Sequence, residues 1–333
     1  MKKYHLYALG NALVDMEFSV DDTFLAQMNI EKGFMTLVDQ ERQQTLLQAL
    51  NQQQGKKACG GSAANTIIAT QYFGGQSFYS CKVANDERGK FYLDNLTAAG
   101  VHTLDHEREP GITGSCLVFI TPDAERTMNT FLGITADVSG YEVEPSAIAN
   151  AQFVYLEGYL VTSPTARAAA IQVKEIARAN KVKVAMTFSD PSMVTYFKDG
   201  INDMLGDGVD LLFCNQEEAN TWAETDSLEE SIEALKKIAR SFVITLGAQG
   251  ALIFDGNTLI EIPSCPTKAV DTNGAGDMFA GAYLYGITAG HTPTHSGHLA
   301  SLAAAKVVSQ FGPRLRPEQH GEILKQWKAQ ELS

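Results

Sequence analysis

The chain lacks an apolar run long enough to cross a membrane as a helix, and it lacks closely paired cysteines. A membrane-spanning helix needs about 20 mostly apolar residues, and cysteines at C-x-x-C spacing are typical of zinc or redox sites. The five cysteines here are odd in number and scattered, which favours reduced thiols in a cytoplasmic protein. No apolar stretch of signal-peptide length follows the lysines near the N-terminus.

Positive charge is scarce as well. The chain has 26 Lys and Arg residues against 39 Asp and Glu residues, which gives a net charge of −13. Surfaces that bind nucleic acid or anionic membranes need clustered Lys and Arg, so we expect neither as a partner. A hydrophobic content of 44% and a length of 333 residues suit one large core with a small appendage. We expect a single domain that spans residues 1–333.

Two common nucleotide-binding motifs are missing. Dinucleotide-dependent oxidoreductases carry G-x-G-x-x-G after the first strand, whereas Gly10 stands alone there. The G-x-x-x-x-G-K-[ST] loop of P-loop enzymes is absent too. These absences argue against both enzyme classes.

Short apolar runs of strand length alternate with patterns of helical period along most of the chain. The alternation predicts a three-layer α/β/α fold, whose mostly parallel central sheet is covered by helices on both faces. Ligands of such sheets bind beyond the C-terminal ends of the strands. We expect strands at residues 6–10, 77–83, 153–157, 182–187, 209–214 and 242–246, and the clearest helices at 165–180, 216–221, 228–240 and 294–310.

Two segments break this alternation, because they contain strand patterns with no helical pattern between them. They lie at roughly residues 12–37 and 112–132 and predict a small antiparallel sheet that stands off the main body. Three aromatic residues of this sheet, Phe34, Phe119 and Phe131, are suited either to stacking on a base or to filling the core of the sheet.

The most informative stretch is N-G-A-G-D at residues 273–277, which is followed by an apolar run of helical period. A glycine turn that opens a helix directs backbone N–H groups and the positive end of the helix dipole at one point, where an anion binds. Asp277 is repelled by such an anion, but it is well placed to accept a proton from a group that attacks the anion. A phosphate cradle beside a general base is the equipment of phosphoryl transfer. The alternative is an ordinary helix start with a stabilising Asp.

A second glycine-rich element, Gly60 and Gly61, also precedes an apolar helix. Asn65 falls in the first turn of that helix. Its amide offers two donors and one acceptor, which suits a pair of neighbouring hydroxyl groups. The alternative interpretation of Asn65 is a capping or turn residue.

Together the two elements resemble the paired signatures of the PfkB/ribokinase family of carbohydrate and nucleoside kinases. Four further segments resemble motifs of this family, and all six occur in the family's order between residues 10 and 281. The four are G-N-A-L-V-D at 10–15, V-A-N-D-E-R-G at 83–89, N-Q-E-E at 215–218 and T-L-G-A-Q-G at 245–250. The resemblance implies a ribokinase-like fold in which the small sheet serves as a lid over the substrate. A lid excludes water, which otherwise competes for the phosphoryl group.

The resemblance also implies roles for the glycine turn. Asp277 would be the general base that accepts the proton of a primary hydroxyl group, and the amides of Gly274, Ala275 and Gly276 would stabilise the transferred phosphoryl group. Arg126 would approach the phosphoryl group from the lid as a charge clamp. The alternative for Arg126 is a solvated hairpin arginine.

The nucleotide and cation roles rest on the same resemblance. ATP is the expected phosphate donor, and Thr245, Gly247 and Gly250 match the loop that contacts the nucleotide. The alternative for these three residues is a turn between two strands, a role compatible with the first. Asn215 and Glu218 would hold Mg²⁺, in part through water, because Mg²⁺ dehydrates reluctantly. Their alternative is a helix N-cap with an ordinary first-turn Glu.

Some family members need a monovalent cation near the catalytic loop. The resemblance points to Asp271 and Asn273, with residues 309–313, as suppliers of oxygen ligands for K⁺.

The substrate residues implied by the resemblance share a position near the strand ends. Asp15 follows the apolar pair at 13–14, where a carboxylate needs hydroxyl partners. Glu157 ends an apolar strand and is a weaker candidate of the same kind. The expected substrate-binding residues are Asn11, Asp15, Gly60, Gly61, Asn65 and Glu157.

The choice of substrate is less constrained. Ser62 stands where ribokinases have a lysine, and G-N-A-L-V-D is similar to the adenosine kinase-like branch, whereas Glu157 favours sugar kinases. We expect a purine nucleoside, adenosine first, with ribose, fructose or 2-keto-3-deoxygluconate as the alternative. A non-catalytic nucleoside-binding regulatory protein is the alternative from another class. An exposed lid edge would pair two subunits of a homodimer, or the lid would cover the site of a monomer.

Three histidines near the C-terminus, His291, His295 and His298, have a spacing that some zinc sites use. Gly290 and Pro293 suggest that a helix starts after His291, which would separate it from the other two. We expect a solvated surface there rather than a metal site.

Overall fold

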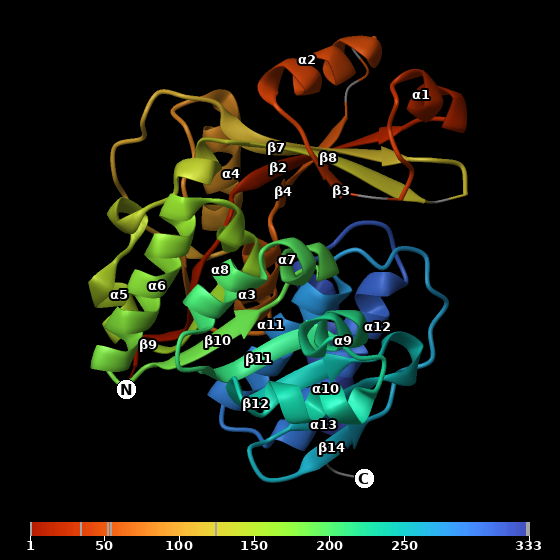
Figure 1. Cartoon of the computed structure of the whole chain (residues 1–333). Coiled ribbons are helices and arrows are strands. Elements are labelled where there is room, and N and C mark those ends of the chain that lie inside the picture. The colour runs from red at the N-terminus through yellow and green to blue at the C-terminus, as the bar shows by residue number, and fades with distance from the viewer. Residues whose placement is uncertain (1, 34, 52, 54, 124, 331–333) are drawn as a thin grey trace.

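The computed structural model describes residues 2–33, 35–51, 53, 55–123 and 125–330. Its main body is built on a large sheet (Figure 1). The strands of this sheet are β1 (Tyr4–Leu9), β5 (Ser77–Ser80), β6 (His102–Thr103), β9 (Ala151–Glu157), β10 (Lys183–Thr187), β11 (Val209–Asn215), β12 (Ala239–Thr245), β13 (Ala251–Phe254) and β14 (Leu259–Ile262). They are ordered β14-β13-β12-β11-β10-β9-β1-β5-β6, and all neighbours from β12 to β6 are parallel.

Side chains alternate between two cores along the buried strands. In β9, Phe153 and Tyr155 belong to one core, while Val154 and Leu156 belong to the other. Continuous burial of this kind is typical of a parallel sheet covered on both faces, so the expected three-layer α/β/α architecture is confirmed. The first core is covered by α3 (Ser62–Tyr72), α4 (Glu87–Ala98), α11 (Ala275–Thr288), α12 (Pro293–Val308) and α13 (Pro317–Gln330), and the second by α5 (Pro145–Ala149), α6 (Pro164–Ala179), α7 (Pro191–Tyr196), α8 (Lys198–Leu205), α9 (Gln216–Ala223) and α10 (Leu228–Leu235).

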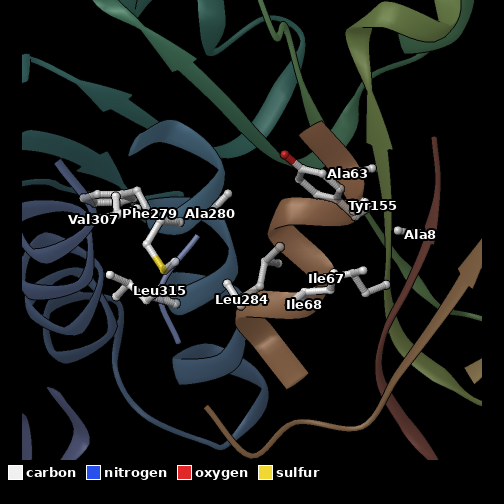
Figure 2. Close-up of a cluster of buried hydrophobic side chains, with 14 of the residues drawn as sticks. Ala8, Ala63, Ile67, Ile68, Tyr155, Phe279, Ala280, Leu284, Val307 and Leu315 are labelled. Atoms are coloured by element: carbon white, nitrogen blue, oxygen red, sulfur yellow. The ribbon is translucent and has the colours of Figure 1, made fainter. Parts of the chain in front are cut away.

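Helices α3 and α11, which follow the two glycine-rich elements, pack against each other. Figure 2 shows Ile68 of α3 and Leu284 of α11 facing each other in the first core. Thr70 of α3 also donates its hydroxyl proton to the carbonyl oxygen of Gly281 on α11, at 3.0 Å. This packing brings the N-terminal ends of the two helices together, although they are far apart in the sequence.

A smaller sheet lies above the strand ends of the large one in Figure 1, with α1 (Asp22–Gln27) and α2 (Gln40–Ala49) on its outer side. Its strands are β2 (Leu13–Ser19), β3 (Met35–Leu37), β4 (Lys56–Gly60), β7 (Thr113–Ile120) and β8 (Arg126–Gly133), in the order β3-β8-β7-β2-β4. The pairs β7–β8 and β2–β4 are antiparallel as expected, whereas β2–β7 and β3–β8 are parallel. Strand β4 lies outside the two segments from which the sequence predicts this sheet.

Most expected elements lie within a few residues of their predicted positions. The helix expected at 228–240 ends earlier, at Leu235, and Ala239 already belongs to β12. The chain turns there because the N–H of Val209 bonds to the carbonyl of Ile238 at the start of the β11–β12 pair. A strand after Gly250 was expected only through the alternative of a strand-to-strand turn at 245–250, which β13 matches, whereas the antiparallel strand β14 at the sheet edge was not predicted.

Candidate active site

A cavity of about 500 Å³ lies between the small sheet and the C-terminal ends of the large sheet's strands. Its two walls differ in chemistry. The large sheet and its helices contribute mostly polar groups, including Asp277, Glu157 and Glu218. The small sheet contributes mainly aliphatic and thioether side chains, together with Asp15, Cys116 and Thr130. The apolar set is Leu13, Met35, Leu37, Met128 and Leu132.

The glycine turn at the start of α11 borders this cavity with Gly274, Ala275 and Gly276. Gly274 has a φ of +74°, which favours glycine, and a Cβ there would lie 2.5 Å from the Cβ of Pro313. The N–H of Ala275 donates to the carbonyl of Thr272 at 3.2 Å, so this amide is part of a turn. The predicted glycine turn and helix start are thus present, and one of the three N–H groups expected to hold an anion is engaged within the protein.

Asp277 lies in the first turn of α11 and is held by two side chains from α3. The hydroxyl of Ser62 donates to Oδ1 at 2.6 Å, and Nδ2 of Asn65 donates to Oδ2 at 2.8 Å. Burial raises the pKa of Asp277 to about 6, against the lowering effects of these two hydrogen bonds and of the positive charge on Arg314. A carboxylate with a pKa near neutrality is suited to general base catalysis at physiological pH.

Glu157, at the end of β9, forms hydrogen bonds both to the segment after β1 and to the start of α3, which follows the second glycine-rich element. Its side chain is fully buried, and its Oε1 and Oε2 accept hydrogen bonds from the N–H groups of Asn11 and Ala63, each at 2.7 Å. Burial raises its pKa to about 7. The carboxyl group lines the cavity as expected, but the partners seen in the structure are backbone amides that it holds in place.

Asp15 lines the cavity from β2, and burial raises its pKa to about 7. Gly60 does not line the cavity. It makes room for Asp15 instead, because a Cβ at position 60 would lie 2.1 Å from Oδ1 of Asp15. The other expected substrate residues, Asn11, Gly61 and Asn65, do border the cavity.

Asn215 and Glu218 form a capping box at the start of α9, which is the alternative arrangement that the sequence allowed. Oδ1 of Asn215 accepts from the N–H of Glu218 at 2.7 Å, and Glu218 Oε2 accepts from the N–H of Asn215 at 3.1 Å. Unlike a capping residue on the protein surface, Glu218 is only 4% exposed, and burial raises its pKa to about 8. Nδ2 of Asn215 also donates to Oε1 of Glu218 at 3.0 Å, and both residues line the cavity.

The T-L-G-A-Q-G segment forms the turn between β12 and β13. Thr245 and Gly247 line the cavity, whereas Gly250 does not. Gly250 has a φ of +98° and packs against the carbonyl of Ile262, so its role in the structure is that of a turn residue.

Arg126 and Asp271 form an ion pair that bridges the small sheet and the loop before α11. Nε of Arg126 lies 3.0 Å from Oδ2 of Asp271, and its Nη2 lies 2.9 Å from Oε1 of Glu17. Asp271 also accepts hydrogen bonds from the N–H groups of Asn273 and Gly312. Arg126 therefore shares its positive charge between Asp271 and Glu17, and the expectation that Asp271 binds K⁺ stays a prediction.

Sequence reasoning missed several residues of the site. Ser62 was considered only as a family difference, yet it binds Asp277. Ser189 and Asp190 line the cavity after β10, and Ser189 has a φ of +72°, a strained conformation that is typical of functional sites. The dipeptide Asp190-Pro191 after an apolar strand was the available signal. Arg314, near Asp277, had no signal in the local sequence.

Two of the three expected aromatic residues, Phe119 and Phe131, do not border the cavity. Phe119 packs against Phe18 and Phe24 within the small sheet and its helix. Phe131 alternates with the cavity-lining residues Thr130 and Leu132 along β8. Phe34 lies outside the described residues.

The three histidines do not form a metal site in the described part of the chain, where no group of three His, Cys, Asp or Glu residues is placed to hold a metal ion. His291 precedes α12, as predicted. The rings of His291 and His295 pack against Trp327, with centroids 4.6 and 4.2 Å away. Both residues are half-buried, so the expected solvated surface is only partly exposed at these two positions.

A family profile described as pfkB family carbohydrate kinase matches residues 35–319. The chain belongs to the PfkB family. Adenosine kinase 2 of Arabidopsis thaliana is 29% identical over 306 residues, which cover 84% of this chain and 86% of the relative.

Two solved structures extend the comparison. A probable sugar kinase from Rhizobium etli CFN 42 aligns with a TM-score of 0.91 and 33% identity, over 98% of this chain and 99% of the other. An adenosine kinase from Sinorhizobium meliloti aligns with a TM-score of 0.89 and 32% identity, over 96% and 99% of the two chains.

Membership of the PfkB family establishes the reaction class. The protein is a phosphotransferase that acts on a hydroxyl group of a nucleoside or sugar, and the family implies ATP as the phosphate donor. The relatives also support the adenosine kinase-like branch. Within the described residues, no helix is both long and apolar enough to span a membrane.

Proposed function

We propose that this protein is an ATP-dependent kinase that transfers the γ-phosphate to the primary 5′-hydroxyl of a purine nucleoside, adenosine first. The observation that carries the proposal is Asp277, which lines the cavity half-buried and is bound by Ser62 and Asn65 at the start of α11. The adenosine kinases among its relatives support the nucleoside.

In the proposed reaction, Asp277 accepts the proton of the 5′-hydroxyl as that oxygen attacks the γ-phosphorus. A new P–O bond forms to the nucleoside, the bond from the γ-phosphorus to the bridging oxygen breaks, and ADP leaves with its electron pair. The N–H groups at the start of α11 stabilise the charge on the transferred group. A pKa of about 6 keeps Asp277 largely ionised at neutral pH and therefore able to accept the proton.

The apolar wall of the small sheet supports a nucleoside over a free sugar. A free sugar carries hydroxyl groups around its ring and gains little from apolar contact, whereas a purine base presents two apolar faces. Met35, Met128 and Leu132 are positioned to cover such a face. In this proposal the small sheet is the lid, and its closure excludes water from the phosphoryl group.

Mg²⁺ is proposed to accompany ATP, with Glu218 and Asn215 as the residues that hold it. Mg²⁺ prefers oxygen ligands, and Glu218 is a buried carboxyl group whose pKa is raised to about 8 by burial, so a bound cation would stabilise its ionised form. When bound, the ion would neutralise charge on the nucleotide phosphates. Thr245 and Gly247 are proposed to contact the nucleotide.

A sugar kinase of the same family is the second candidate, favoured by the similarity to the probable sugar kinase structure. The test is ADP release from MgATP by the purified protein with adenosine, inosine, guanosine, ribose, fructose and 2-keto-3-deoxygluconate as acceptors. We expect kcat/KM for adenosine to be at least tenfold higher than for any free sugar, because a free sugar lacks the purine base and its contacts with the protein. Turnover with a free sugar alone would overturn the nucleoside proposal and keep the reaction class.

A further inference from the structure

Arg314 lies close to the base without bordering the cavity. It belongs to the segment that follows α12, and its Nε donates a hydrogen bond to Oδ1 of Asn65 at 2.7 Å. Asn65 in turn donates from Nδ2 to Oδ2 of Asp277 at 2.8 Å. The three side chains therefore form a relay of two hydrogen bonds that ends on the base.

The relay fixes the direction of the Asn65 amide. An asparagine amide has an oxygen that only accepts and a nitrogen that only donates. A donor such as Arg314 on one side forces the oxygen toward itself, which leaves the nitrogen to face the carboxylate of Asp277. Without Arg314, rotation of the amide by a half-turn would place its oxygen against the carboxylate and remove the hydrogen bond.

Arg314 also supplies positive charge in an acidic environment. The carboxyl groups of Asp15 on β2, Glu157 on β9 and Glu218 on α9 all interact electrostatically with Asp277, and each has a raised pKa. The charge on Arg314 acts in the opposite direction and lowers the pKa of Asp277.

The backbone around Arg314 is held against the glycine turn. The N–H of Gly312 donates to Oδ2 of Asp271 at 2.7 Å, and Pro313 packs against Gly274. Nε2 of Gln310 donates to the carbonyl of Arg314 at 3.1 Å. Nη2 of Arg314 is buried and makes no hydrogen bond within the described part of the chain. A buried donor atom without a partner is costly, which argues for a role beyond packing.

We propose that Arg314 is a positioning residue for phosphoryl transfer, which orients Asn65 so that its amide nitrogen holds Asp277 in place for proton transfer. The inference rests on the proposed function of Asp277 as the base. It concerns a residue that is not among those lining the cavity.

The test compares Arg314→Met, Arg314→Lys and the control Arg316→Met with the wild-type protein, using whichever acceptor the wild type phosphorylates. Arg316 lies two residues further on, and its side chain is exposed. Loss of a charge-assisted hydrogen bond network is expected to lower kcat by about 10- to 100-fold in Arg314→Met. Removal of the positive charge should also move the acidic limb of the kcat pH profile upward by about one pH unit. Arg314→Lys keeps the charge, so its acidic limb should stay near that of the wild type, while Arg316→Met should change neither quantity.

A double-mutant cycle with Asn65→Ala separates positioning from general loss of structure. If Arg314 acts through Asn65, Arg314→Met should cost little further activity once Asn65 is removed. Additive losses, or an unchanged kcat and pH profile in Arg314→Met, would overturn the proposal.

A measurement that does not depend on turnover tests the role of Arg314 separately from the proposed kinase function. Carbon-13 NMR titration of the Asp277 carboxyl carbon, assigned by its loss in Asp277→Asn, should show a higher pKa in Arg314→Met than in the wild type. An unchanged titration argues against Arg314 even if no acceptor is found. Absence of turnover in the wild type counts against the proposed function instead.

Discussion

Nδ2 of Asn65 lies 2.8 Å from Oδ2 of Asp277, although the two residues are 212 positions apart in the sequence. The contact joins the first turns of α3 and α11, the helices that follow the two glycine-rich elements. It gives a reason for these elements to occur together, since one provides the proposed base and the other provides the side chains that bind it. Ser62, from the same turn of α3, holds the second carboxylate oxygen.

Replacement of the base is the first prediction. Asp277→Asn keeps the size of the side chain but cannot accept a proton, so kcat should fall by about 10²- to 10⁴-fold. The KM for the acceptor should change by less than about threefold, because the proton is transferred only in the transition state. Steady-state ADP release at saturating MgATP measures both constants. A kcat within twofold of the wild type would exclude Asp277 as the base.

The second prediction contrasts two glycines of the same turn. Gly274→Ala forces a left-handed backbone on alanine and places its Cβ 2.5 Å from Pro313, so we expect the free energy of unfolding to fall by about 2 kcal/mol or more. Gly276 has open space around the position of a Cβ and lies within α11. Gly276→Ala should therefore retain or slightly raise the free energy of unfolding. Urea unfolding of both variants checks the contrast, and equal stabilities would contradict the observed packing of Pro313 on Gly274.

The third prediction concerns the Mg²⁺ dependence of the reaction. Glu218→Gln removes the buried negative charge that we propose for holding the ion, so the free Mg²⁺ concentration at half-maximal activity should rise by about tenfold. Glu217→Gln, on the adjacent exposed side chain, is the matched control.

Because Glu218 also caps α9, its replacement needs a separate check of the fold. Thermal unfolding without Mg²⁺ provides that check. A lower kcat with an unchanged Mg²⁺ dependence would assign Glu218 to the helix cap alone.

The order of strands and helices could be predicted because continuous apolar runs indicate strands that are buried on both faces. Strands such as β9 and β11 are buried on both faces and appear as continuous apolar runs. Strand β4 was missed because its residues Lys56 and Lys57 are exposed at the edge of the small sheet. The end of α10 was misplaced because Ala239 and Arg240 fit a helical period as well as a strand.

The site was predictable where a motif encodes backbone geometry, as at Gly274 and Asp277. It was not predictable where a role depends on tertiary contacts. Glu157 was expected to face a hydroxyl group, but it binds the backbone at Asn11 and Ala63. Arg314 lies 249 positions from its partner Asn65 in the sequence, and no local sequence pattern predicts a contact between them.

The last prediction uses the buried carboxyl of Glu157. Its pKa in the folded protein is raised to about 7 from an ordinary value of 4.5, so the folded state holds a proton that the unfolded state has lost between these pH values. This group therefore stabilises the fold fully below about pH 4.5, and its contribution disappears as the pH rises through 7.

The Glu157→Gln variant isolates this contribution, because glutamine does not titrate. Between pH 5 and pH 8, the free energy of unfolding of the wild type should fall relative to the variant by an amount on the order of 3 kcal/mol. The variant should also be less stable at pH 5, since one of the two backbone N–H groups now faces an amide NH₂, but that offset does not depend on pH. Urea titrations at several pH values measure the difference, with Glu175→Gln on the exposed face of α6 as control. Parallel pH profiles for the wild type and Glu157→Gln would mean that Glu157 is ionised in both the folded and unfolded states, with its charge fully stabilised by the N–H groups of Asn11 and Ala63.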